Sequence, residues 1–183
     1  MLTIVIPEND YYDPQTNVIK TNPACTVTLE HSLISISKWE AKWRQPFLST
    51  FSKESFSMDM YRDYIACMSV TPVAPEIFVG LTPDNMNAIK QYIDNPMTAT
   101  TFSQRGPQGP VSRGAVTAEV LYYRMFSNQI PIECQKWHLN RLLTLLRVFD
   151  IKNSPPQKMS RKDTASRNSQ LNAMRRAQMH TRG

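Results

Sequence analysis

The sequence predicts a mainly α protein of the α+β class, in which a body of about five helices carries a small N-terminal β-hairpin and a basic C-terminal arm. Three observations support this prediction. Apolar residues recur at helical spacing in several segments, two strand-like runs lie near the N-terminus, and no aromatic residue follows Phe149. We therefore expect a globular body over residues 1–152, with the hairpin in residues 1–31, and an arm over residues 153–183.

The charge of the chain is concentrated in the predicted arm. The formal net charge is +6 over 183 residues. Residues 151–183 contain eight Lys/Arg and one acidic residue, or +7, which leaves 13 basic and 14 acidic side chains, or −1, for residues 1–150. A neutral body gives no indication of a nucleic-acid-binding surface. The arm could bind phosphates by its charge, but its lack of aromatic residues argues against stacking on single strands.

Cysteine usage and hydropathy indicate an intracellular, soluble protein. Cys25, Cys67 and Cys134 are an odd number of widely spaced cysteines without a CxxC motif, which predicts reduced thiols. No run approaches the roughly 18 apolar residues of a membrane-spanning helix. The N-terminus lacks the charged start and small-residue cleavage site of a signal peptide.

The first two strands and the first helix follow from short-range patterns. Leu2–Ile6 and Cys25–Leu29 predict strands, and the polar, turn-rich residues between them predict a long irregular loop. Ser37 and Glu40 have the S-x-x-E spacing of a capping box, which predicts that a helix starts there and ends before Pro46.

Two tryptophans, Trp39 and Trp43, lie on one face of this first helix, one turn apart. We favour a place for them in the core, because each ring buries a large apolar area. The alternative is an exposed platform for binding a partner.

Further helices are predicted at Ser57–Ser69, from the cap Thr82 to the stop at Asn95, and at Thr117–Asn128. In the last of these, Val120, Tyr123 and Ser127 are expected on one stripe, with Leu121 and Met125 flanking it. The segment Met97–Gly114 is predicted to be a loop, and its P-x-x-P at Pro107–Pro110 is too common to indicate a recognition site.

The most apolar segment is Ile132–Asp150, in which Leu139, Leu142, Leu146 and Phe149 fall on one broad arc. With Pro131 placed for a first turn, the pattern predicts one continuous helix that forms the central wall of the core.

The sequence contains no pattern of an enzyme. HExxH and GxSxG motifs are missing, and the five glycines are too scattered for a phosphate-binding loop. Cys134 and His138 have metal-ligand spacing, and a zinc site would need His31 and the other two cysteines to complete it. A packed thiol and a hydrogen-bonded imidazole are the favoured interpretation, so we expect no catalysis, no metal and no cofactor.

The arm is predicted to fold mainly against a partner. Met159–Gly183 has fair helix propensity but few apolar residues, and such a helix is marginal alone. Its charge suits an acidic or helical protein partner, and a solvated terminus is the alternative. The candidate partner-binding residues are Trp39, Trp43, Arg161, Lys162, Arg167, Leu171, Met174, Arg175 and Arg176.

Four longer blocks resemble segments of the tail assembly chaperone family of bacteriophages with long non-contractile tails. They are LEHSLISISKWEAKW (Leu29–Trp43), PMTATTFS (Pro96–Ser103), ECQKWHLNRLLTLLR (Glu133–Arg147) and IKNSPPQKMS (Ile151–Ser160). The loop sequence QRGPQGPVSRG and the pair Phe149-Asp150 depart from the family pattern.

The resemblance implies a non-enzymatic assembly factor in the host cell cytoplasm. Such chaperones bind the tape-measure protein in many copies and are displaced as tail-tube subunits polymerise around it. Two alternatives remain. One is a structural virion protein, such as a head–tail connector or tail-completion protein, and the other is a nucleic-acid-binding accessory protein.

Overall fold

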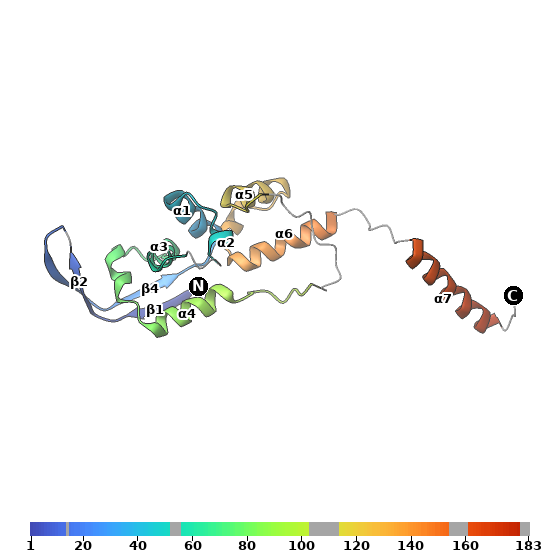
Figure 1. Cartoon of the computed structure of the whole chain (residues 1–183), viewed down its shortest axis with the longest axis horizontal. Helices are drawn as coiled ribbons and strands as arrows, with labels where there is room; N and C mark the ends of the chain where they lie inside the picture. The colour runs from blue at the N-terminus through green and yellow to red at the C-terminus, as the bar shows by residue number, and fades with distance from the viewer. Residues whose placement is uncertain (14, 52–55, 103–113, 154–160, 180–183) are drawn as a thin grey trace.

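A computed structural model of the chain describes residues 1–13, 15–51, 56–102, 114–153 and 161–179, with the backbone alone described at 161–163. The strands are β1 (Leu2–Ile6), β2 (Asn9–Asp13), β3 (Val18–Asn22) and β4 (Cys25–Leu29). The helices are α1 (Leu33–Trp43), α2 (Phe47–Thr50), α3 (Met58–Met68), α4 (Pro83–Asp94), α5 (Ala118–Ser127), α6 (Leu139–Asn153) and α7 (Arg161–Met179), with 3-10 helices η1 (Pro75–Gly80) and η2 (Ile132–Lys136). The predicted class, mainly α with an N-terminal β-hairpin, is confirmed (Figure 1).

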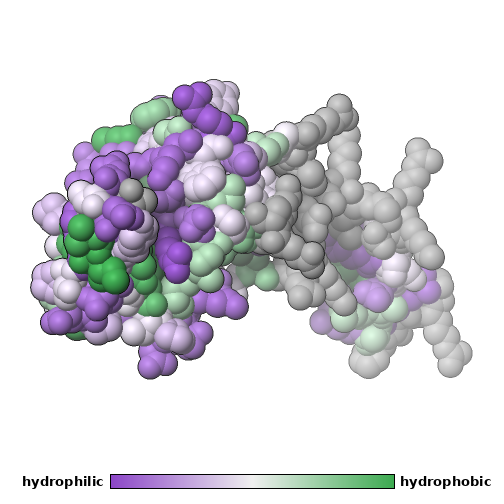
Figure 2. All heavy atoms as spheres, turned by 60° about the vertical axis from the view of Figure 1, so that its left-hand side comes forward, coloured by the Kyte–Doolittle hydropathy of each residue, from purple (hydrophilic) through white to green (hydrophobic). Residues whose placement is uncertain are grey.

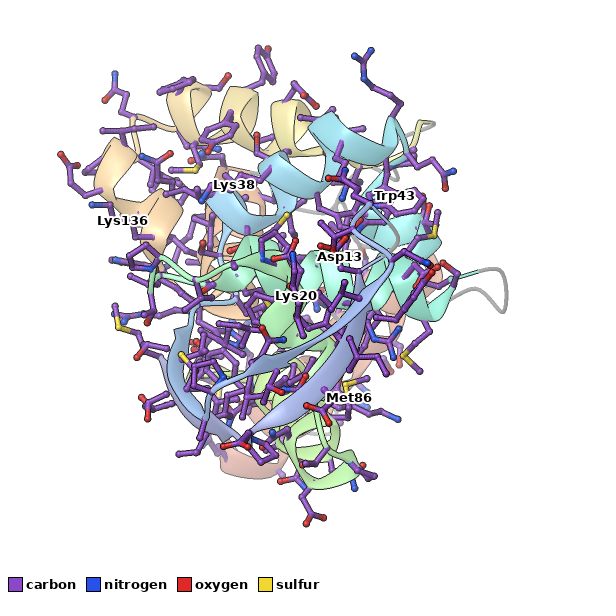
Figure 3. All side chains as sticks on the ribbon, turned by 90° about the vertical axis from the view of Figure 1, so that its left-hand side faces the viewer. Asp13, Lys20, Lys38, Trp43, Met86 and Lys136 are labelled. Atoms are coloured by element: carbon purple, nitrogen blue, oxygen red, sulfur yellow. The ribbon has the colours of Figure 1, made fainter. Side chains whose placement is uncertain are left out.

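The hairpin is longer than the sequence predicts. β1 pairs with β4, and β2 pairs with β3, both antiparallel, so the expected irregular loop is wrong. Asp13 and Lys20 form an ion pair across the β2–β3 ladder (Figure 3), and the Thr21 hydroxyl donates to Asp10 at 2.6 Å. Asn17 closes the turn in the left-handed region at φ 57°. These cross-strand contacts stabilise a polar ribbon that has no apolar run to reveal it.

Helix α1 contacts several other helices of the body, whereas the Leu-rich helix was expected to form its central wall. It packs against α2, α3, α5 and η2 and buries Leu33, Ile36 and Trp39 completely. The predicted capping box is also wrong, because the N-cap of α1 is Ser32, five residues before Ser37, and Glu40 lies in the last turns of the helix. The Glu40 carboxylate points into the core instead, where it accepts hydrogen bonds from other helices.

The caps of α3 and α4 confirm the predictions made for them. Ser57 Oγ accepts from the Met60 amide at 3.2 Å, and Thr82 Oγ1 accepts from the Asn85 amide at 3.2 Å. Each bond satisfies an amide that has no intrahelical partner, so a local signal was sufficient to set these helix starts. Asn95 ends α4, as expected.

Helix α5 is rotated relative to its predicted orientation. Its buried residues are Ala118, Leu121 and Met125, whereas Tyr123 is 71% exposed and Val120 is half-buried. The expected stripe through Val120 and Tyr123 is therefore not the buried one, whereas Leu121 and Met125, expected to flank it, are buried. The first amide of α5 donates to the buried carboxylate of α1, which fixes the face that this helix turns inward.

The Leu-rich segment divides into η2 and α6, so the single predicted helix is wrong at its start. The Leu139 amide donates to the His31 carbonyl at 2.8 Å, and Ser32 and His138 form an isolated β-bridge. A backbone paired in this way cannot also be helical. Leu139, Leu142 and Leu146 are nevertheless buried, which agrees with the predicted apolar arc.

Helix α7 lies apart from the body (Figure 1). Every side chain described in it, over residues 164–179, is exposed. Residues 161–179 of the arm are thus helical in this structure, and the side chains described among them are not buried against the body. The Gly- and Pro-containing loop tip and its P-x-x-P, by contrast, fall outside the described residues.

Candidate protein-binding surfaces

The two candidate tryptophans belong to an aromatic cluster beneath the surface. Trp39 has no exposed surface, donates its Nε1–H to the Met60 carbonyl at 3.0 Å, and stacks on Phe56 with centroids 5.6 Å apart. Trp43 is half-buried and donates to Asp63 Oδ2 at 3.1 Å. Trp39 therefore serves the core, as the favoured interpretation predicted, and its proposed contact with a partner is wrong for this conformation. Trp43 keeps part of its surface exposed.

An open groove runs between α3 and α4 beside this cluster. One hollow of about 380 Å³ is lined by Phe51, Phe56, Ser57, Met58, Tyr61, Met86, Asn87, Lys90 and Asp94. A second of about 350 Å³ is lined by Met58, Arg62, Leu81, Pro83, Met86 and Asn87. Because Met58, Met86 and Asn87 line both, we treat the two as one surface and name it the α3–α4 groove. Figure 3 labels Met86 on α4.

The α3–α4 groove combines an apolar floor with charged ends. Phe56 forms part of the floor and is held by its contact with Trp39. Burial, together with the charge of Asp94, raises the pKa of Tyr61, so its hydroxyl stays protonated at neutral pH and can donate a hydrogen bond. Methionine side chains on both walls are flexible and polarisable, and they fit apolar groups of different shapes. Sequence reasoning missed this groove because its residues come from separate helices.

A second candidate surface is one stripe of α7. Arg167, Leu171 and Met174 are spaced i, i+4, i+7, which places them on one side of the helix. Leu171 and Met174 are 41% and 66% exposed. Arg175 and Arg176 are also exposed, and Arg176 lies on the opposite side of the helix. Arg161 and Lys162 form the first turn, where only the backbone is described.

A third surface, which sequence reasoning did not find, is the solvent-facing side of α5. We name Glu119, Tyr123 and Phe126 the α5 outer face. Phe126 is 60% exposed and stacks on Tyr122, with ring centroids 6.4 Å apart. Figure 2 shows that apolar atoms on the visible side of the body gather in separate patches within a largely hydrophilic surface. The spacing of Ala118, Leu121 and Met125 was the signal that could have revealed the correct orientation.

Two of the metal-ligand candidates, the buried His31 and the half-buried His138, form a pair. The rings of His31 and His138 have centroids 5.0 Å apart, and the Tyr64 hydroxyl bonds to His31 Nδ1. His138 Nε2 donates to the Tyr92 carbonyl at 3.0 Å, and its buried Nδ1 has no hydrogen-bond partner among the described residues. Burial, with the adjacent His138, lowers the pKa of His31 to about 3, so the ring is neutral at pH 7.

The described residues offer this pair no further metal ligands. No group of three or more His, Cys, Asp or Glu side chains in the described ranges could hold a metal ion. Cys25, Cys67 and Cys134 are free thiols; Cys134 is buried, and the other two are half-buried. His31 is part of the core, and the half-buried His138 packs against its ring.

Comparisons with protein-family models, with curated proteins and with solved structures found no match to this chain. Within the part of the chain that the structure describes, no helix has the length and apolar character needed to cross a membrane.

Proposed function

We propose that this protein is a non-enzymatic bacteriophage tail assembly chaperone. In this proposal it binds the tape-measure protein in the host cytoplasm and is displaced when tail-tube protein assembles around that client. The four sequence blocks that resemble the family support the proposal. The structural observation that carries it is the α3–α4 groove, which is open and has methionines on both walls and charged residues at its ends.

The groove suits an amphipathic helix of the client. Such a helix binds by inserting apolar residues at i, i+3, i+4 and i+7 into an apolar groove. Met58 and Met86 can adjust to client segments that differ in sequence, because methionine adopts many rotamers at low cost. Lys90 and Asp94 at one end and Arg62 at the other can pair with the polar side of the bound helix.

Many copies of modest affinity fit this task better than one tight contact. A long client presents many binding segments, and copies that also contact one another gain affinity through effective concentration. Each copy can still leave when the tube protein competes for the same segment. Helix α7, exposed over its described side chains, is available for contacts between copies.

The test is co-expression with the candidate tape-measure protein, followed by measurement of the soluble client. We expect the wild-type chain to keep the client soluble and Met86→Glu to lose this activity, because the new carboxylate would have to be desolvated in the groove. Val70→Glu is the matched control, since Val70 is 54% exposed and does not line either hollow. Equal client solubility with Met86→Glu and wild type would contradict the proposal, provided that both variants show wild-type circular dichroism.

A second candidate function is binding to nucleic acid, which the exposed Arg167, Arg175 and Arg176 of α7 favour. This function predicts micromolar binding to duplex DNA that weakens steeply with salt. A fluorescence-anisotropy titration at two salt concentrations measures it. Binding that persists after Arg175→Glu and Arg176→Glu would argue against α7 as the site.

A further inference from the structure

We propose that α7 of one copy docks in parallel on the α5 outer face of a second copy of this chain. The contact would pair Glu119 with Arg167, Tyr123 with Leu171, and Phe126 with Met174. It would be a binding surface between copies and needs no client, so it stands or falls separately from the proposed chaperone function.

The α5 outer face presents aromatic rings next to a fixed negative charge. Tyr123 is 71% exposed and Phe126 is 60% exposed, one turn apart along α5. Glu119 lies one turn before Tyr123, and its carboxylate accepts hydrogen bonds from its own amide and from the Thr117 hydroxyl. These bonds lower the pKa of Glu119, so the carboxylate is ionised at neutral pH. Apolar rings of this size at the surface are a usual mark of an interface.

Helix α7 presents the complementary surface. Leu171 and Met174 are 41% and 66% exposed, and Arg167 lies one turn before Leu171. A helix this polar is marginal in isolation, so a partner that covers its apolar stripe would stabilise it. Both surfaces therefore have a charge followed by two large apolar residues, and the two charges have opposite sign.

The spacing of the two stripes fixes the direction of the helices. Glu119, Tyr123 and Phe126 are spaced i, i+4, i+7, and Arg167, Leu171 and Met174 have the same spacing in the same order. In parallel helices, residues at equal rise lie side by side, so all three pairs form together. In the antiparallel arrangement the two apolar pairs can still form, but Glu119 then lies opposite the neutral Gln178. Charge complementarity thus favours the parallel arrangement.

The length of the segment between α6 and α7 favours docking of α7 on a second copy over docking on α5 of the same chain. The end of α6 lies beside the end of α5, because Asn153 Nδ2 donates to Asn128 Oδ1 at 3.5 Å. In a parallel pair, the first residue of α7, Arg161, would lie about 22 Å from Asn128 along the axis of α5, towards its N-terminus, as the rise per residue gives. The two helix axes would be about 10 Å apart. The eight peptide steps from Asn153 to Arg161 span at most about 26–29 Å. The same chain could reach only if those steps were almost straight, whereas a second copy has no such constraint.

Sedimentation equilibrium of the full chain over a concentration series tests the proposal. We expect wild-type self-association, and at least a tenfold weakening in each of Glu119→Arg, Arg167→Glu and Leu171→Glu. The double variant Glu119→Arg with Arg167→Glu should recover most of the lost affinity, because it restores the ion pair in reversed polarity. Arg176→Glu is the matched control: it makes the same charge change on the opposite side of α7 and should leave association unchanged.

Three outcomes would overturn the proposal. A wild-type chain that stays monomeric up to about millimolar concentration excludes the contact, because association weaker than this is below that of a specific interface. If Arg176→Glu and Arg167→Glu weaken self-association equally, the copies attract one another by non-specific charge and not through the proposed contact. Rescue of Glu119→Arg by Gln178→Glu, but not by Arg167→Glu, shows antiparallel docking. Thermal melts monitored by circular dichroism establish that each variant retains its fold.

Discussion

Replacement of Glu40 should destabilise the whole body, because this carboxylate joins three helices. Its side chain, on α1, is 8% exposed. Oε1 accepts from the Phe47 amide and Oε2 from the Ala118 amide, each at 2.7 Å. These are the first amides of α2 and α5, which have no partner within their own helices. Glu40 thus supplies from α1 the acceptor that a local N-cap normally provides.

The magnitude follows from the two bonds that would be lost. A hydrogen bond to a charged group contributes about 1.5–3 kcal/mol, and a buried amide left without an acceptor costs about 1–3 kcal/mol. Glu40→Ala should therefore lower the free energy of unfolding by roughly 3–6 kcal/mol, a large part of the about 5–15 kcal/mol typical of a whole domain. Glu40→Gln should cost about half as much, because its amide oxygen can still accept from one of the two amides.

Urea denaturation monitored by tryptophan fluorescence measures this effect, since Trp39 lies one residue from Glu40. Glu76→Gln is the control, because Glu76 is exposed on η1, and its effect should stay within about 0.5 kcal/mol. A loss below about 1 kcal/mol for Glu40→Ala would refute the reasoning, since it would mean that both amides find other acceptors at little cost.

Two further predictions concern buried rings. Burial and the adjacent His138 lower the pKa of His31 from 6.5 to about 3, so between these pH values the unfolded chain binds a proton that the folded chain does not. The free energy of unfolding should therefore fall by up to about 1.4 kcal/mol per pH unit as the pH is lowered from about 6.5 towards 3. Urea titrations at several pH values should show that the free energy of unfolding of His31→Gln depends less steeply on pH than that of wild type. Trp39→Phe should lower the free energy of unfolding by about 2–3 kcal/mol, because it leaves a cavity and an unpaired Met60 carbonyl. Trp43→Phe, at a half-buried position, should lower it by about 1 kcal/mol or less. Equal losses of stability in thermal melts of the two variants would contradict this reasoning from burial.

Several elements could be predicted from the sequence because their causes are local. The starts of α3 and α4 depend on Ser57 and Thr82, each of which binds an amide three residues away. The end of α4 depends on Asn95 and the proline that follows it. The separation of charge between body and arm is also visible in composition, and α7 lies apart from the body.

The candidate surfaces were only partly predictable. The α7 stripe could be read from the sequence, because its residues lie on one helix and its spacing is regular. The α3–α4 groove could not, since Phe51, Met58 and Met86 meet only when three helices pack. The α5 outer face was assigned to the wrong side, because Tyr123 and Leu121 are both apolar enough to face a core.

By itself, the sequence determined the class of the fold, the ends of those helices that carry their own caps, and the position of the positive charge. Tertiary structure alone decided the β2–β3 ladder, the orientation of α5, the start of α6 and the packing of α1 against α2, α3, α5 and η2. For α5 and α6 the physical reason is a hydrogen bond between groups distant in sequence, and for the β2–β3 ladder it is a set of polar side-chain contacts across its turn. Asp13 meets Lys20 across a turn, Leu139 donates to His31, and Glu40 accepts from Ala118, 78 residues away.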